Sequence, residues 1–151
     1  VACGVGRQAT ALAKRGYEVV ALDYSLAMLA RGAEVAQEQS AKVTYTQADM
    51  CAMDFNEVFD AAYCVGTSFG YFDDEKNAEV ARKIHRALKP HGTFLLGVVN
   101  RDHVIQRQPG MAWFEGDGCV CMEETTFNFI TSRLNVKRTV IFEDGRQRET
   151  E

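Results

Sequence analysis

Gly4, Gly6 and Asp23 are the residues near the start of the chain whose types and spacing suit nucleotide binding. The two glycines lie one residue apart, between a small apolar stub and the helix-like segment 9–15. Because they lack a Cβ, the backbone can turn sharply and lie against a ligand, and the first amides of the helix can donate hydrogen bonds to it. We therefore expect a strand that turns into a helix around a bound nucleotide.

Asp23 follows a β-prone run, Tyr17–Ala21, and is expected at the carboxyl end of a second strand. A carboxylate in that place can accept two hydrogen bonds from the vicinal hydroxyls of a ribose. Two other interpretations stay open. Asp23 could simply precede a helix capped by Ser25, and a glycine turn with Ala9 in the third position also occurs in dinucleotide-binding folds.

Strands and helices alternate through the first hundred residues. The further segments are the β-prone Val43–Gln47 and Phe59–Val65, the helical Asp74–Leu88 and the β-prone Thr93–Val99. Residues 89–92, Lys-Pro-His-Gly, form a stop signal after the long helix. This alternation predicts an α/β fold with a mostly parallel sheet.

Four motifs, taken in order, resemble the class I S-adenosylmethionine-dependent methyltransferases. They are Ala-Cys-Gly-x-Gly-Arg, Leu-Asp-Tyr-Ser-x-x-Met-Leu, Gln-Ala-Asp-Met and Ala-Leu-Lys-Pro-His-Gly. The resemblance covers Val1 to about Asn100 and implies a Rossmann-like, doubly wound sheet, S-adenosylmethionine as cofactor and a small molecule as methyl acceptor. The chain departs from the family at its start, because the acidic residue that usually precedes the first motif is not part of this sequence.

The resemblance also implies a set of cofactor-binding residues at the ends of the strands. They are Ala2, Gly4, Gly6, Asp23, Tyr24, Asp49, Met50, Cys64 and Val65. In this set Asp23 is expected to hold the ribose hydroxyls, and Tyr24 and Met50 to flank the adenine. Asp49 is expected to accept from the adenine amino group. The backbone of Cys64 and Val65 would face the methionine amine.

The chain is expected to divide into a cofactor-binding core, residues 1–100, and an antiparallel β insertion, residues 101–151. The core is expected to hold only the last stub of its first strand, and the sequence stops in the middle of a β-prone run. We therefore expect a chain that is truncated at both ends.

The insertion is predicted to be an antiparallel meander. Its β-prone stretches lie near Val120–Phe129, near Leu134–Phe142 and from Arg146 onward. Turns are expected at residues 131–132 and 143–145, where Asp144-Gly145 is a strong hairpin signal. The insertion is expected to act as a lid over the acceptor, as in some small-molecule methyltransferases, including sugar N-methylating ones. The alternatives are a homodimer surface or an extension of the scaffold.

Methyl transfer from a sulfonium mainly requires that the acceptor lone pair be held in line with the methyl–sulfur bond. A general base helps when the acceptor carries a proton, and His103, Tyr71 and Asp102 are the polar candidates, with His103 and Tyr71 preferred. The expected substrate pocket has apolar walls from Phe69, Tyr71 and Trp113, with Phe72 beside them. Core packing is the alternative role for each aromatic side chain.

Composition favours a cytoplasmic globular enzyme that acts on a small molecule. Hydrophobic residues make up 46% and charged residues 25% of the chain, and no apolar run approaches the roughly 20 residues of a membrane helix. A net charge of −4 gives no general attraction to nucleic acid. The five cysteines are expected to remain thiols. Cys119 and Cys121 have no histidine near them in sequence, so no metal site is expected.

Two other functions share some of these features. A NAD(P)-dependent oxidoreductase of Rossmann type would have the same glycine turn and Asp23, but the sequence contains no Tyr-x-x-x-Lys pair for hydride transfer. A non-catalytic cofactor-binding module would keep the turn and lack a productive acceptor pocket. Turnover with a panel of acceptors separates these alternatives.

Overall fold

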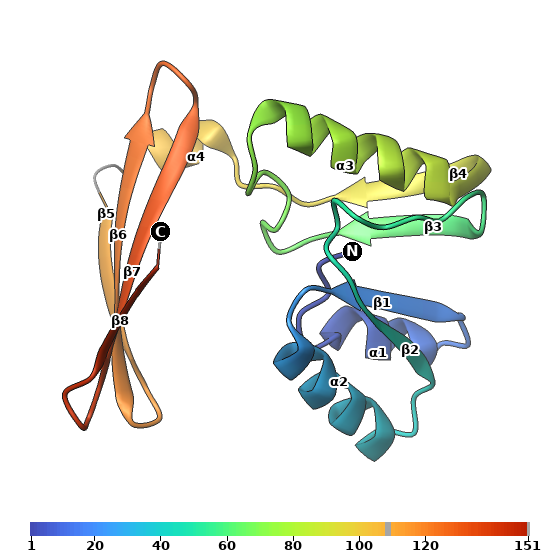
Figure 1. Ribbon diagram of the computed structural model, residues 1–151, viewed down its shortest axis with the longest axis horizontal. Helices are drawn as coiled ribbons and strands as arrows, with labels where there is room; N and C mark the ends of the chain where they lie inside the picture. The colour runs from blue at the N-terminus through green and yellow to red at the C-terminus, as the bar shows by residue number, and fades with distance from the viewer. Residues whose placement is uncertain (108–109, 151) are drawn as a thin grey trace. The chain divides into compact units, whose positions relative to one another are not determined.

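The computed structural model describes residues 1–107 and 110–150, which form two compact units, Val1–Val98 and Val99–Glu151 (Figure 1). The first unit contains α1 (Arg7–Ala13), β1 (Val19–Asp23), α2 (Leu26–Glu38), β2 (Val43–Gln47), β3 (Phe59–Cys64), α3 (Asp74–Ala87) and β4 (Leu88–Leu96). The second contains α4 (Arg101–Ile105), β5 (Gly110–Gly116), β6 (Cys119–Asn128), β7 (Arg133–Phe142) and β8 (Gln147–Thr150). None of the helices described is long and apolar enough to cross a membrane.

The strands of the first unit form two parallel pairs, β1 with β2 and β3 with β4. The sequence predicts one continuous sheet, and the structure has residues 1–3 between the two pairs instead. The Val1 ammonium group donates to the Tyr63 carbonyl at 2.8 Å, and the Cys3 amide donates to the Leu22 carbonyl at 3.0 Å. These few bonds link β3 to β1 without making a strand of their own.

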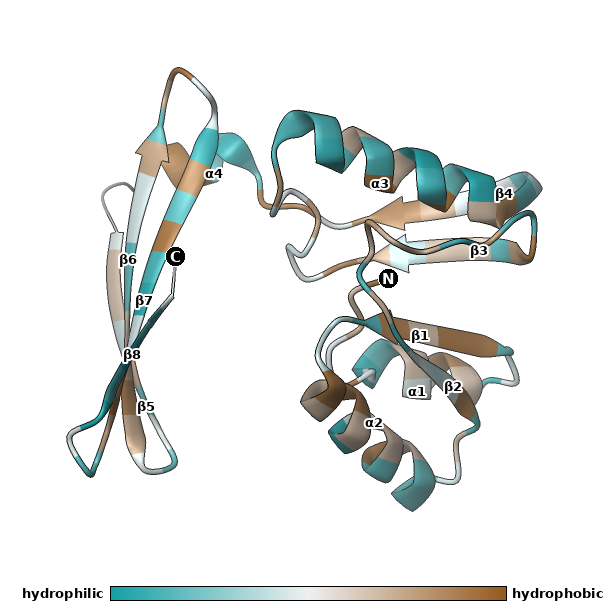
Figure 2. Cartoon of the chain, in the orientation of Figure 1, coloured by the Kyte–Doolittle hydropathy of each residue, from teal (hydrophilic) through white to brown (hydrophobic). Residues whose placement is uncertain are grey.

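Helix α3 covers the core of the first unit with one apolar face. Val80 and Ile84 lie one turn apart on it and pack with Leu22 and Met53 in a buried cluster. Figure 2 shows hydrophilic residues along the outer side of this helix. The Asp73 side chain accepts from the Lys76 amide at 2.8 Å and fixes the start of the helix.

The end of α3 differs slightly from the prediction. The helix ends at Ala87, and Leu88 already pairs with Phe59 of β3. Residues 89–92, predicted to be a stop signal, form an irregularity within β4, because the register shifts before Ala61 pairs with Thr93. His91 has a positive φ of 65° there.

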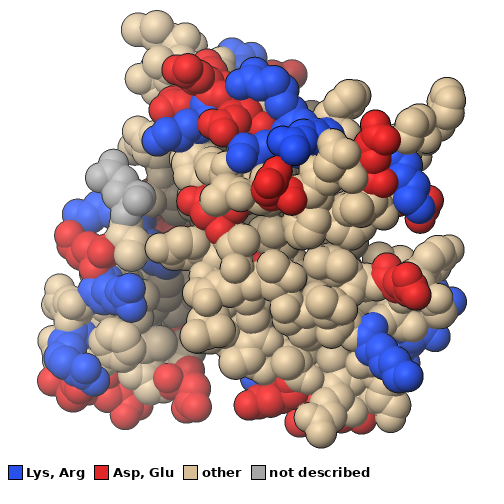
Figure 3. Space-filling view, turned by 45° about the vertical axis from the view of Figure 1, so that its right-hand side comes forward, with Lys and Arg blue, Asp and Glu red and all other residues tan. Residues whose placement is uncertain are grey.

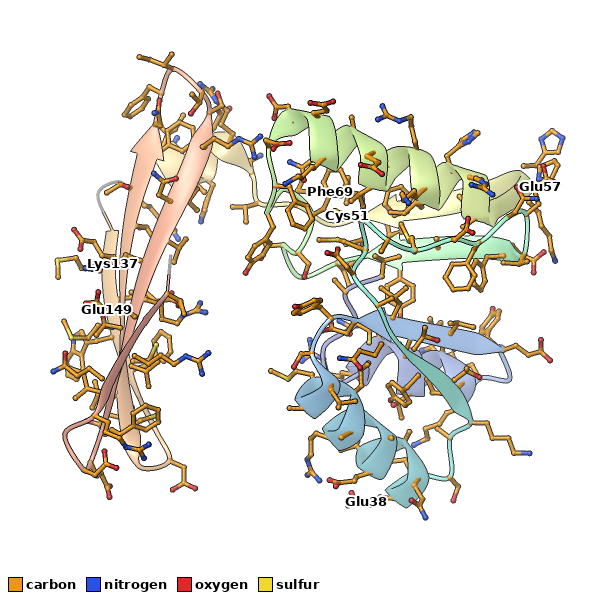
Figure 4. All side chains as sticks on the ribbon, viewed as in Figure 1. Glu38, Cys51, Glu57, Phe69, Lys137 and Glu149 are labelled. Carbon is orange, nitrogen blue, oxygen red and sulfur yellow. The ribbon has the colours of Figure 1, made fainter. Side chains whose placement is uncertain are left out.

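The second unit is a four-stranded antiparallel sheet in the order β5-β6-β7-β8. The three predicted stretches correspond to β6, β7 and β8, with bounds close to those expected. Strand β5 was not predicted, and it places Trp113 opposite Met122. Lys137 and Glu149, labelled in Figure 4, form an ion pair at 3.5 Å between β7 and β8.

Candidate functional site

A cavity of about 370 Å³ lies where the parallel strands β1 and β2 end. Its walls come from four segments that are far apart in the sequence: Ala2, Leu22, Asp23, Tyr24, Ala48, Asp49, Met50, Ser68, Tyr71 and Phe72. The carboxyl ends of parallel strands meet at one edge of a sheet, which is where open α/β folds bind ligands. The cavity brings together Ala2, Asp23, Tyr24, Asp49 and Met50 from the predicted cofactor set.

Asp23 forms hydrogen bonds with the glycine loop and with the start of α2. Its Oδ2 accepts from the Gly4 amide at 2.7 Å, and its Oδ1 accepts from the Ser25 amide at 2.9 Å. Ser25 is also the N-cap of α2, since its side chain accepts from the Met28 amide at 3.3 Å. Each carboxylate oxygen can accept a further hydrogen bond, so Asp23 can hold the loop and a ligand hydroxyl at the same time.

The glycine loop has a left-handed backbone at Ala2, Gly4 and Gly6, with φ of 51°, 56° and 68°. A Cβ on Gly6 would lie 2.6 Å from the Tyr45 hydroxyl oxygen, so Tyr45 fills the space under the loop. A Cβ on Gly4 would have no atom within 4 Å. The loop is therefore supported from one side and open at Gly4, where a ligand can approach the backbone.

Gly32 of α2 supports the same loop, and no sequence pattern points to Gly32 or to Tyr45. A Cβ on Gly32 would lie 2.8 Å from the Val5 carbonyl oxygen and 3.0 Å from the Tyr45 ring. The Tyr45 hydroxyl is buried without a hydrogen-bond partner among the described residues. A lone glycine inside a helical pattern and a tyrosine inside a strand are too common to predict such a contact.

The thiols near the site are not activated nucleophiles. Burial raises the pKa of the Cys3 thiol, and the nearby Asp23 carboxylate raises it further. Burial also raises the pKa of the Cys64 thiol and outweighs the opposing effects of the Val1 ammonium group and the Phe69 backbone hydrogen bond. A raised pKa disfavours the nucleophilic thiolate form, so neither thiol is activated for covalent chemistry.

Cys64 and Val65, predicted to face the methionine amine, lie at the end of β3 outside the walls of the described cavity. The Cys64 carbonyl accepts from the Gly97 amide at 2.9 Å. Gly97 itself packs closely against Val65, whose Cγ1 would lie 3.3 Å from a Cβ at that position. Their role toward a cofactor stays a prediction.

The residues predicted for the acceptor lie in different places. Phe69 packs against the core cluster, as does Cys51, and both are labelled in Figure 4. Tyr71 lines the cavity beside Asp23 and Asp49. His103 and Trp113 belong to the second unit and are exposed, and the His103 amide donates to the Asn100 side chain at 3.1 Å. Their predicted roles remain untested by this geometry.

Potential metal-binding groups do not gather in the part of the chain that the structure describes. Cys119 and Cys121 share one face of β6, but no cluster of three potential metal-ligating side chains is found among these residues. Acidic and basic side chains are interspersed on the face in Figure 3.

Comparison with known proteins adds to this geometry. A family model described as "Methyltransferase domain" matches residues 1–92. A glycine/sarcosine N-methyltransferase of Parasynechococcus marenigrum is 32% identical over 123 residues, which cover 80% of this chain and 43% of that protein. The chain thus spans less than half the length of this relative.

Solved structures show the same fold. An S-adenosylmethionine-dependent methyltransferase from Clostridium acetobutylicum matches 99% of this chain and 62% of its own, with a TM-score of 0.80 and 19% identity. An amino pentose methyltransferase from Micromonospora echinaspora, solved with S-adenosylmethionine bound, matches 99% of this chain and 64% of its own, with a TM-score of 0.67 and 21% identity. At these identities the likeness establishes a Rossmann-like α/β fold.

Proposed function

The chain belongs to the methyltransferase domain family, and on that premise we propose that the protein transfers the methyl group of S-adenosylmethionine to an oxygen or nitrogen atom of a small molecule. Amine substrates named for similar proteins, glycine or sarcosine in one case and an amino pentose in another, support an acceptor of this size. The net charge of −4 and the interspersed surface charges give no support to a nucleic-acid substrate.

The observation that carries this proposal is the Asp23 carboxylate at the mouth of the glycine loop. It is fixed by the Gly4 and Ser25 amides and lines a cavity that also contains Asp49 and Met50. Asp49 Oδ1 accepts from the Cys51 amide at 2.8 Å, which holds that carboxylate in place at the end of β2. Hydroxyl and amino groups of an adenosine find acceptors in the two carboxylates, so the residues present fit the cofactor.

S-adenosylmethionine supplies an electrophilic methyl group: the acceptor atom forms a bond to this carbon, the carbon–sulfur bond breaks with its electron pair going to sulfur, and the acceptor proton leaves to a base or to water. The protein's task is mainly to position the reactants. Asp23 and Asp49 hold the nucleoside, and the open backbone at Gly4 lets the ligand lie close to the loop.

Two residues of the second unit keep the acceptor roles that the sequence predicts for them. His103 and Trp113 come from α4 and β5, and their exposed side chains are available to a substrate. His103 would take the acceptor proton, and Trp113 would provide an apolar wall. A homodimer contact through the same sheet is the second candidate role for Trp113.

The experiment is a turnover assay that follows S-adenosylhomocysteine by mass spectrometry. S-adenosylmethionine is supplied with a panel of amino sugars, small amino acids and phenols. We expect product with at least one acceptor, and about tenfold less with Asp23→Asn when the cofactor concentration is below its Kd for the unchanged protein. Binding of the cofactor without turnover on any acceptor would favour the non-catalytic module. Oxidation or reduction of a nicotinamide cofactor would contradict the proposal.

A further inference from the structure

Tyr71 lies in the wall of the cavity that contains Asp23 and Asp49, together with Ser68 and Phe72. These three residues belong to the loop between β3 and α3. The sequence assigned Tyr71 to the acceptor, as a base or as a pocket wall. Its place in the structure, on the cavity formed by the ends of β1 and β2, points to a different ligand.

The loop is built so that Tyr71 stays outside the core. Phe69 and Phe72 pack against the buried cluster. The Asn77 side chain holds the Phe72 backbone on both sides: its Nδ2 donates to the carbonyl at 2.6 Å, and its Oδ1 accepts from the amide at 3.4 Å. Gly70 has a φ of 104°, a backbone conformation that residues with a Cβ rarely adopt. Tyr71, between Gly70 and Phe72, is left 78% exposed.

Tyr24 is the second exposed tyrosine of the same cavity. It follows Asp23 at the end of β1 and is 77% exposed. A tyrosine ring has a large apolar face that is favourable to cover. The cavity therefore combines two uncovered aromatic rings with the carboxylates of Asp23 and Asp49, which suits a ligand that is both flat and rich in hydroxyl and amino groups.

The size of the cavity limits what these rings can cover. Its volume of about 370 Å³ is at the small end of the roughly 300–1,000 Å³ typical of ligand sites. A space of this volume is large enough for a nucleoside, whose base can stack on an aromatic ring.

We propose that Tyr71 forms an aromatic wall for the nucleoside part of the cofactor, beside Tyr24, which the resemblance already assigns to the adenine, and that Tyr71 does not act on the acceptor. The proposal rests on the proposed function, since it takes the bound nucleoside to be the adenosyl group. Asn77 is a positioning residue in this account, because it fixes the Phe72 backbone next to Tyr71.

The test is a calorimetric titration of the full chain with S-adenosylhomocysteine and, separately, with adenosine. The variants are Tyr71→Ala and Tyr71→Phe, and Tyr17→Ala is the matched control, because Tyr17 is a 63% exposed tyrosine that does not line this cavity. We expect Tyr71→Ala to weaken both ligands by roughly tenfold, as for the loss of one base-stacking ring. Tyr71→Phe and Tyr17→Ala are expected to bind like the unchanged protein, with melting temperatures equal to its own.

The other outcomes distinguish a wrong role for Tyr71 from a wrong proposed function. If the unchanged chain binds S-adenosylhomocysteine and Tyr71→Ala binds it equally well, the inference is wrong and the proposed function stands. If Tyr71→Ala weakens S-adenosylhomocysteine but not adenosine, Tyr71 contacts the amino acid part and the nucleoside assignment is wrong. If the unchanged chain binds neither ligand, the proposed function itself fails.

Discussion

The two compact units differ in how their strands meet. In Val1–Val98 each strand pair is parallel and joined through a helix, so the ends of distant segments come to one edge and form a cavity. In Val99–Glu151 neighbouring strands pair antiparallel through short turns. The comparison teaches that parallel topology brings five of the predicted cofactor residues, Ala2, Asp23, Tyr24, Asp49 and Met50, to one cavity. A sheet of hairpins does not gather residues in this way.

The units also differ in burial. Leu22, Val80 and Ile84 are buried in the first unit, whereas Cys121 is the buried hydrophobic side chain among the described residues of the second. Each face of the second sheet therefore carries partly exposed apolar residues, including Trp113 and Met122 on one of them. The first unit holds its own core, and its stability depends on that core.

The largest expected effect is on the stability of the first unit. Ile84, which is 1% exposed, is replaced by Ala, and we expect the free energy of unfolding to fall by about 2–5 kcal/mol because a cavity is left in the core. Met122→Ala, at a half-exposed site in the second unit, is expected to cost about 1 kcal/mol or less. Urea unfolding with hydrogen exchange of the α3 amides for Ile84→Ala, and of the β6 amides for Met122→Ala, measures the two effects. Equal losses of unfolding free energy in the two variants would contradict the difference in burial between the two units.

The second effect concerns the site. Asp23→Ala is expected to weaken S-adenosylhomocysteine binding by at least about tenfold, because charge-assisted hydrogen bonds to the ribose are lost. The melting temperature is expected to fall as well, since the bonds to the Gly4 and Ser25 amides are also removed.

Asp54→Ala is the control for the Asp23 variant, because Asp54 is an exposed carboxylate that pairs with Arg86 on the surface, at 3.3 Å. It is expected to leave affinity and melting temperature nearly unchanged. Calorimetry and thermal unfolding give the two readouts. An Asp23→Ala variant with unchanged affinity would show that Asp23 only organises the loop and the helix start.

The third effect tests whether the second unit contributes to acceptor binding. Trp113→Ala or His103→Ala is expected to raise the acceptor Michaelis constant or lower turnover several-fold, while S-adenosylhomocysteine affinity stays nearly constant. Steady-state kinetics with an active acceptor measures the Michaelis constant and turnover, and calorimetry measures the S-adenosylhomocysteine affinity. If Trp113→Ala instead dissociates an oligomer, with kinetics per folded subunit unchanged, the sheet is an interface and not an acceptor wall.

The smallest effect is electrostatic. Burial is the main cause of the raised pKa of the Cys3 thiol, and Asp23 adds to it. Asp23→Asn removes that charge, so the pH midpoint for alkylation of Cys3 is expected to move to lower pH. Peptide mass spectrometry of iodoacetamide labelling against pH measures the midpoint. A midpoint that stays in place would mean that Asp23 does not act on the thiol.

Much of the first unit was predictable because its signals are local and repeated. The resemblance to class I S-adenosylmethionine-dependent methyltransferases is confirmed, and the motif containing Asp23 stands where a strand end was expected. Tyr45 and Gly32 could not be predicted, since their contact with the glycine loop joins segments with no distinctive pattern. The position of Tyr71 on the cavity could not be predicted either, because it depends on the packing of Phe69 and Phe72 against the core.

In the second unit the Asp144-Gly145 turn was a reliable signal, and Gly145 has the positive φ, 82°, that such a hairpin requires. Strand β5 was missed because Gly110 and Gly116 begin and end it and the segment between them lacks a regular apolar alternation. Pairing with β6, a tertiary effect, decides its structure.

The central claim is that the first unit binds an adenosyl sulfonium cofactor at Asp23. Calorimetric titration of the chain with S-adenosylhomocysteine, S-adenosylmethionine and NAD tests it most directly. We predict saturable binding of the first two, weakened by Asp23→Asn, and no heat from NAD. Tight binding of NAD without any response to S-adenosylhomocysteine would contradict the account.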